Sequence, residues 1–305
     1  MKSSSQYAVA ALMAATALGG CSGTAGSPDR RPGDAHAVRV VAIERVYGDL
    51  ASQLGGKDVI VTTILNSPTA DPHEYEPTVA DARAIANADV VIENGLGYDA
   101  FADKLLAASP NAARTAIVVG SLAGHTAGQN PHVWYQAATL VAFAEIFARD
   151  LERRRPNRKP QIAHARLGID AWVAKLDAHL ATIARNSGGA KVAITEPVFD
   201  YVLHAAHLDI ATPAGFSHAI EEGTDPAPQD VAAMHALIGG KHVAAFVYNS
   251  QTVEPSTTQL LGLAKSSQVP VVSVTETLPA GTTTQRWIDG EVAALSAALP
   301  RTTSH

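Results

Sequence analysis

Two short segments of the sequence place a histidine directly behind a proline. Asp71-Pro72-His73 lies within ADPHEYEPT, and Asn130-Pro131-His132 lies within QNPHVWYQ. In each, a side chain able to bond its own backbone precedes a proline with a fixed φ, so the loop is predicted to hold its imidazole in one direction. A lone histidine is more often a structural residue, but two matching loops favour a pair of ligands.

The second loop also predicts the local structure around its histidine. Asn130 suits the N-cap of a helix and Pro131 the first helical position, so His132 is expected in the first turn. The positive end of the helix dipole disfavours imidazolium. We therefore expect a neutral His132 ring that is ready to bind a cation.

Runs of β-branched residues alternate with helix-like stretches, which is typical of βα units around parallel sheets. The predicted strands form two groups, the first at 38–43, 59–65, 89–94 and 116–120, and the second at 191–195, 243–248 and 269–274. Between the groups, apolar residues with helical spacing run from 162 to 183 and predict one long amphipathic helix. We expect an α/β fold of two Rossmann-like lobes with parallel sheets, joined by one long backbone helix.

Four residues follow predicted strands, where ligands collect in parallel α/β sheets. His73 and His132 follow the second and fourth predicted strands, and Glu196 and Glu276 follow the fifth and seventh. We expect them to meet in the cleft between the lobes, because ligands bind beyond the carboxyl ends of parallel strands. Two imidazoles and two carboxylates predict a site for one first-row metal ion.

The N-terminal segment has the pattern of a secretory signal. Lys2 precedes an apolar run at 7–20, which is shorter than the about 20 residues that span a membrane. LGGC is similar to a bacterial lipobox, in which cleavage before Cys21 lets this residue carry a diacylglyceryl group. A buried thiol in a core helix is the alternative. The chain has 1 cysteine, so no internal disulfide is possible.

These patterns divide the chain into five parts. They are a signal peptide at 1–20, a lipidated tether at 21–37, an N-terminal lobe at 38–158, a linking helix at 159–189 and a C-terminal lobe at 190–305. The net charge of -6 comes without a basic stripe, and the basic run at 153–159 is interpreted as the solvated end of a helix. Binding of nucleic acid is therefore not expected.

Five motifs extend over most of the mature chain: ADPHEYEPTVAD, ADVVIENGLGYDAF, NPHVWYQ, TEPVFDYV and VTETLPAGTTTQRW. They resemble the metal-binding lipoproteins of bacterial manganese, zinc and iron ABC importers, the zinc-uptake component A type. The resemblance implies one transported metal ion held by His73, His132, Glu196 and Glu276, with no catalysis. It also implies a monomeric, lipid-anchored extracytoplasmic receptor that serves an ABC permease and its ATPase.

The metal is left open between Mn²⁺ and Zn²⁺. The acid at position 276 is more often Asp in this family, and GSLAGHTAGQN holds only His125 where many zinc-specific members carry a histidine-rich loop. Carboxylates favour manganese, whereas the Irving–Williams order favours zinc in raw affinity.

Other interpretations of the same residues stay open. A metal-dependent hydrolase could use such a site to activate water, and a surface lipoprotein could serve adhesion. GLGYDA matches a dinucleotide fingerprint but lacks a later acid for a ribose, so Gly95 and Gly97 are interpreted as a tight strand-to-helix turn. His204 and His207 are either a minor surface site or solvated residues. The three tryptophans are expected in the core, at positions 134, 172 and 287.

Overall fold

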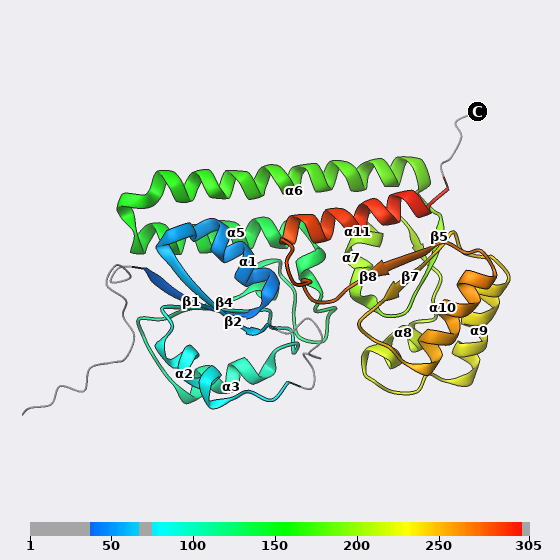
Figure 1. Ribbon diagram of the computed structural model, residues 1–305, viewed down its shortest axis with the longest axis horizontal. Helices are drawn as coiled ribbons and strands as arrows, with labels where there is room; N and C mark the ends of the chain where they lie inside the picture. Colours follow the sequence, from blue (N-terminus) through cyan, green and yellow to red (C-terminus); the bar gives the residue numbers. More distant parts are fainter. Residues whose placement is uncertain (1–36, 67–74, 301–305) are drawn as a thin grey trace, which may run out of the picture. The chain divides into compact units, whose positions relative to one another are not determined.

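The computed structural model describes residues 37–66 and 75–300 of the chain, and residues from Ala37 onward form one compact unit. The predicted signal peptide, the lipidation site Cys21 and the candidate ligand His73 lie outside the described residues. Two four-stranded parallel sheets, each flanked by helices, form two α/β lobes (Figure 1). The predicted fold class is therefore confirmed.

The first sheet has the strand order β2-β1-β3-β4. Its strands are β1 (Val38–Glu44), β2 (Val59–Leu65), β3 (Val90–Glu93) and β4 (Thr115–Val118). The α-helices of this lobe are α1 (Arg45–Gly55), α2 (Val79–Asn87), α3 (Ala100–Ala108), α4 (Val119–Leu122) and α5 (Ala137–Arg154). Val40 and Ala42 pack in one core cluster with α1 and α5, whereas Val41 and Ile43 pack in another with α2 and α3. Alternation along β1 thus directs its side chains into helices on both faces.

The second sheet has the strand order β6-β5-β7-β8. Its strands are β5 (Lys191–Ile194), β6 (Asp209–Ile210), β7 (Ala245–Asn249) and β8 (Val271–Val274). The α-helices that follow β5 are α7 (Asp200–Ala205), α8 (Ala214–Glu221), α9 (Pro228–Gly239), α10 (Pro255–Ser266) and α11 (Thr284–Ala298). All seven predicted strands are present with nearly the same boundaries. The sequence pattern missed β6, because a strand of 2 residues leaves no periodicity.

One long helix, α6 (Lys159–Ser187), connects the lobes. Its 29 residues bury one stripe of side chains: Ile162, Ile169, Trp172, Val173, Leu176, Leu180 and Ile183. The helix packs against α5 and α1 of the first lobe and against α11 and α7 of the second (Figure 1). At 1.5 Å per residue it is roughly 40 Å long, so it is a stiff brace for both lobes.

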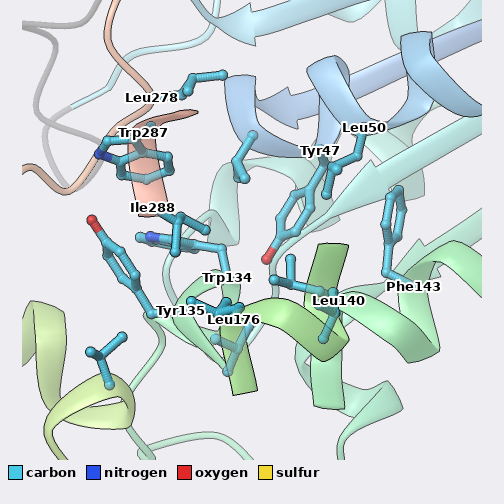
Figure 2. Close-up of a cluster of buried hydrophobic side chains, with 14 of the residues drawn as sticks. Tyr47, Leu50, Trp134, Tyr135, Leu140, Phe143, Leu176, Leu278, Trp287 and Ile288 are labelled. Carbon is cyan, nitrogen blue, oxygen red and sulfur yellow. The ribbon is translucent and has the colours of Figure 1, made fainter. Parts of the chain in front are cut away.

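A single core cluster reaches from the first sheet through α6 to the second. Figure 2 shows Leu140 of α5, Leu176 of α6 and Trp287 of α11 in this cluster, next to Trp134 and Tyr135. The predicted burial of the tryptophans is confirmed. Because both lobes contribute to this one core cluster, the loops between the lobes lie next to closely packed apolar side chains.

The basic run at 153–159, at the junction of α5 and α6, was interpreted from the sequence as the solvated end of a helix. In the structure, two of its arginines instead bind a buried carboxylate. Arg155 precedes the 3-10 helix η3 (Pro156–Arg158) and Arg158 ends it, and both donate to the carboxylate of Asp58, at 2.7 and 2.6 Å. Asp58 ends the 3-10 helix η1 (Gly56–Asp58) and is 4% exposed. Burial raises the pKa of Asp58, but bonding to the two guanidinium groups outweighs it and holds the pKa below its usual value. The run therefore anchors the linking helix to the first lobe.

Among residues 37–66 and 75–300, no helix combines the length and the apolar character that a membrane span requires.

Candidate metal centre

His132 lies in a loop, and no α-helix begins directly after it. One 3-10 turn, η2 (Val133–Tyr135), follows it, and the backbone is extended at Gln136 before α5 begins. The predicted α-helical turn at His132 is therefore wrong. Burial of the whole η2 turn within the core prevails over the helix-start signal of Asn130 and Pro131.

The electrostatic setting of His132 also differs from the expectation. The residue is 0% exposed, and burial lowers the pKa of its imidazole, but Glu276, with Glu221 and Glu196, outweighs burial and raises that pKa above its usual value. The predicted bias toward a neutral ring from a helix dipole is wrong, because no α-helix begins there and carboxylates surround the ring. Nδ1 lies 2.8 Å from Asn130 Oδ1. Nε2 has no hydrogen-bond partner within the described part of the chain.

Glu276 lies just beyond β8 and faces this imidazole from the second lobe. Its Oε1 is 3.6 Å from His132 Nε2 and accepts a 2.8 Å hydrogen bond from the Tyr98 hydroxyl. Its backbone N–H donates to Gln251 Oε1 at 2.6 Å, which fixes the loop. The predicted meeting of His132 with Glu276 is therefore present in the structure.

Glu196 follows β5 and precedes the 3-10 helix η4 (Pro197–Phe199). It is 6% exposed, and its Oε2 accepts a hydrogen bond from the side-chain amide of Asn249. Burial raises the pKa of Glu196 to about 7, and its charge acts on both His132 and Glu276. Three of the four predicted ligands thus belong to one electrostatic cluster between the lobes. In the described residues, no three His, Cys, Asp or Glu side chains are close enough to hold a metal ion by themselves.

Further acids border this cluster and were not singled out from the sequence. Glu221 Oε1 lies 3.9 Å from His132 Nδ1, and burial raises the pKa of Asp200 to about 7. Glu44, at the end of β1, lines a cavity of about 10 Å³ together with Tyr98 and Glu276. Glu44 directly follows the predicted strand at 38–43, as Glu196 follows the predicted strand at 191–195, so the same sequence signal could have identified Glu44.

The GLGYDA turn is confirmed as a structural element that brings Tyr98 to the site. Gly95 and Gly97 have φ of 76° and 94°, and the Asp99 carboxylate accepts hydrogen bonds from the backbone N–H groups of Asn94 and Gly95. Glycine adopts these left-handed conformations without steric cost. Tyr98 is consequently held in the turn just before α3, and its hydroxyl donates to Glu276.

The other histidines considered from the sequence are placed differently. His204 and His207 are exposed on and just after α7, and neither has a contact with His132, Glu196 or Glu276 among the described interactions. His125 is half-buried, and its Nε2 lies 2.9 Å from Gln136 Oε1. These three residues are therefore suitable controls for the candidate ligands.

Residues 40–298 match the family model described as zinc-uptake complex component A, periplasmic. The manganese-binding lipoprotein MntA of Halalkalibacterium halodurans is 27% identical over 48% of this chain and 46% of its own length. The iron ABC transporter substrate-binding lipoprotein MtsA of Streptococcus pyogenes serotype M1 is 24% identical over 77% of this chain and 78% of its own. The alignment with MntA thus spans less than half of that relative.

Solved structures show the same two-lobe fold. The periplasmic zinc-binding protein TroA of Treponema pallidum superposes with a TM-score of 0.71 at 18% identity, over 87% of this chain and 100% of TroA. FpvC of Pseudomonas aeruginosa, solved in complex with Mn²⁺, gives a TM-score of 0.70 at 19% identity, over 86% and 98% of the two chains. With a family model that covers nearly all of the described residues, the chain belongs to the periplasmic zinc-uptake complex component A family.

Proposed function

We propose that this protein is an extracytoplasmic receptor that binds one divalent transition metal ion, Mn²⁺ or Zn²⁺, and delivers it to an ABC permease and its ATPase. Membership of the family supports this function, as do the names of relatives that bind manganese, iron or zinc. The same membership favours metal delivery over hydrolysis or adhesion.

The observation that carries the proposal is the pairing of His132 with Glu276. A buried imidazole nitrogen without a hydrogen-bond partner among the described residues faces a carboxylate oxygen at 3.6 Å. Two ligand atoms that are each about 2.1 Å from one metal ion are about 3.4 Å apart at a tetrahedral angle. The pair can therefore bind one ion with only a small adjustment.

We propose that His73 and Glu196 complete the ligand set of His132 and Glu276. Glu196 is supported by its burial and by its electrostatic interaction with both His132 and Glu276. His73 is supported by the repeated Asx-Pro-His motif. Glu221 adds a carboxylate beside the imidazole, which favours a divalent cation over a neutral ligand.

The proposal extends to the N-terminal segment and the division of the chain. A signal peptide at 1–20 would direct export, and Cys21 would carry the lipid that anchors a monomeric receptor through the tether at 21–37. The lobes at 38–158 and 190–305 would hold the metal between them, braced by the helix at 159–189. Metabolic lipid labelling of the parent and Cys21→Ala tests this part, and label on the variant would contradict it.

Calorimetric titration with ZnCl₂ and MnCl₂ tests the site. We expect the parent to bind one ion, His132→Ala and Glu276→Ala to bind far more weakly, and His204→Ala to match the parent. Unchanged binding by His132→Ala would remove this residue from the site, and a parent that binds neither ion would refute the function. Elemental analysis of the protein isolated from its native envelope identifies which ion it carries.

A further inference from the structure

The side chain of Asn130 contacts both His132 and the segment that carries Glu196. Asn130 Oδ1 lies 2.9 Å from the backbone N of His132 and 2.8 Å from His132 Nδ1. Asn130 Nδ2 donates to the backbone carbonyl oxygen of Pro197 at 2.7 Å. The carbonyl oxygen of Asn130 also accepts a 2.8 Å hydrogen bond from the Tyr201 hydroxyl. One residue of the first lobe is thus bonded to the second lobe directly after Glu196.

The orientation of the Asn130 amide follows from its backbone partners. The His132 backbone N–H can only donate, so the atom that faces it is the amide oxygen, and the Pro197 carbonyl can only accept, so it faces the amide nitrogen. Since the same amide oxygen lies 2.8 Å from His132 Nδ1, that ring nitrogen must carry a proton. In the neutral ring, Nε2 then holds the lone pair.

Among the described residues, no other group accepts a hydrogen bond from His132 Nδ1. Glu221 Oε1 is 3.9 Å from His132 Nδ1, which is too long for a hydrogen bond, and the ring is 0% exposed to water. The Nε2 lone pair is on the side of the ring where Glu276 Oε1 lies at 3.6 Å. Asn130 therefore decides which nitrogen of His132 is able to bind a metal ion.

We propose that Asn130 is a positioning residue for the metal, an inference that rests on the proposed function. Its Oδ1 holds His132 as the Nδ1–H tautomer with Nε2 directed at the site. Its Nδ2 ties the same loop to Pro197 and so sets the position of Glu196 relative to His132. Second partners of histidine ligands commonly act in this way, by fixing the tautomer and the ring orientation.

Two variants separate the acceptor and donor roles of the Asn130 amide. Asn130→Ala removes both the amide oxygen that faces His132 and the amide nitrogen that donates to Pro197. Asn130→Asp keeps an acceptor for His132 but replaces the donor that binds Pro197. Asn111→Ala is the matched control, because the Asn111 side chain accepts a 3.0 Å hydrogen bond from the Ala113 backbone in an exposed turn away from the site.

The measurements are nitrogen-15 NMR of the His132 ring in the metal-free full chain, at a pH where the ring is neutral, and calorimetric titration with ZnCl₂. We expect Asn130→Ala to lose the Nδ1–H tautomer preference and to bind Zn²⁺ about 10 to 100 times more weakly. Asn130→Asp should keep the tautomer and bind more tightly than Asn130→Ala, and Asn111→Ala should match the parent in both. If Asn130→Ala does not fold, Asn130→Leu replaces it, because leucine keeps the volume without an acceptor.

An unchanged His132 tautomer in Asn130→Ala or Asn130→Leu would overturn the proposal, as would parental zinc affinity in either variant. Loss of the tautomer in Asn130→Asp would also count against it. A parent that binds no metal ion refutes the proposed function instead. The ring spectrum of the metal-free variants then still decides whether Asn130 sets the tautomer.

Discussion

The Tyr98 hydroxyl lies 2.8 Å from Glu276 Oε1, so a tyrosine of the first lobe holds a carboxylate of the second. Tyr98 is 3% exposed, and its ring meets the rings of His132 and Trp134 edge-on, with centroids 6.1 and 5.1 Å apart. Because the same carboxylate oxygen faces His132 Nε2, this hydrogen bond joins the lobes at the candidate metal centre.

Removing the Tyr98 hydroxyl should weaken metal binding without creating a cavity in the core. Tyr98→Phe keeps the ring and its packing but removes the donor that orients Glu276. We expect Zn²⁺ and Mn²⁺ affinities to fall by about 10-fold or more, measured by calorimetric titration. Tyr248→Phe, at a buried tyrosine of β7 that packs against Phe246, is the control and should bind as the parent does. Equal affinities for parent and Tyr98→Phe would show that the bond does not support the site.

The two carboxylates should determine how well the site accepts manganese. We expect Mn²⁺ and Zn²⁺ both to stabilise the parent, by about 2.7 kcal/mol at a free metal concentration 100 times the dissociation constant when the unfolded chain binds none. Mg²⁺ and Ca²⁺ should have no effect, because they prefer oxygen-only ligand sets. Glu196→His should selectively lose the Mn²⁺ effect, because it exchanges an oxygen donor for a third imidazole.

Urea denaturation of parent and Glu196→His with each chloride salt measures these effects. Glu145→His, at a 44% exposed carboxylate on α5, is the control and should respond to metals as the parent does. Manganese stabilisation of Glu196→His equal to the parent would mean that Glu196 does not determine the preference.

Glu93 should make the metal-free protein less stable as the pH rises. Burial raises the pKa of this residue to about 8, with further contributions from the charges of Asp99 and Asp103. The folded state therefore binds a proton that the unfolded chain releases near its usual value of about 4.3. The stabilisation is complete below that unfolded pKa and is lost as the pH rises through about 8.

Glu93→Gln removes this titration and should stabilise the metal-free protein at pH 8 by more than about 1 kcal/mol relative to the parent. The difference should shrink toward pH 5, where the Glu93 carboxyl is protonated. Urea denaturation at several pH values measures it, with the exposed Glu145→Gln as control. A Glu93→Gln difference that is constant from pH 5 to 8 would contradict the assignment.

The buried carboxylate of Asp58 should be important for the stability of the linking helix. Asp58→Asn leaves Arg155 and Arg158 without their common anion, and we expect a loss of about 2 kcal/mol at pH 7. The value is below the range for a fully buried ion pair that loses one partner, because the two arginine side chains are 21% and 29% exposed. Glu145→Gln, which breaks an exposed pair with Arg149, should cost less than about 0.5 kcal/mol. Equal losses in the two variants, measured by urea denaturation, would contradict the anchoring role.

Much of the fold follows from local sequence patterns. β-branched runs predicted seven of the eight strands described, and apolar residues with helical spacing predicted α6. These periodicities are visible in the sequence because each strand or helix must bury a defined face. The motifs that end β5 and β8 also located Glu196 and Glu276 at the carboxyl edge of the second sheet, because strand direction alone determines that edge.

The surroundings of His132 were decided only by tertiary structure. Its neighbour Asn130 was expected to cap an α-helix, yet the side chain bonds the ring of His132 and the backbone of Pro197, which is 67 positions away. The acids that raise the pKa of His132 come from separate segments of the second lobe, and Tyr98 reaches Glu276 across 178 positions. Local propensity determines strands and helices, but burial, charge and hydrogen-bond partners depend on which distant segments pack together. The sequence by itself therefore singled out His132, Glu196 and Glu276, which the structure brings near one another, whereas the tertiary structure decided how these side chains are oriented and protonated.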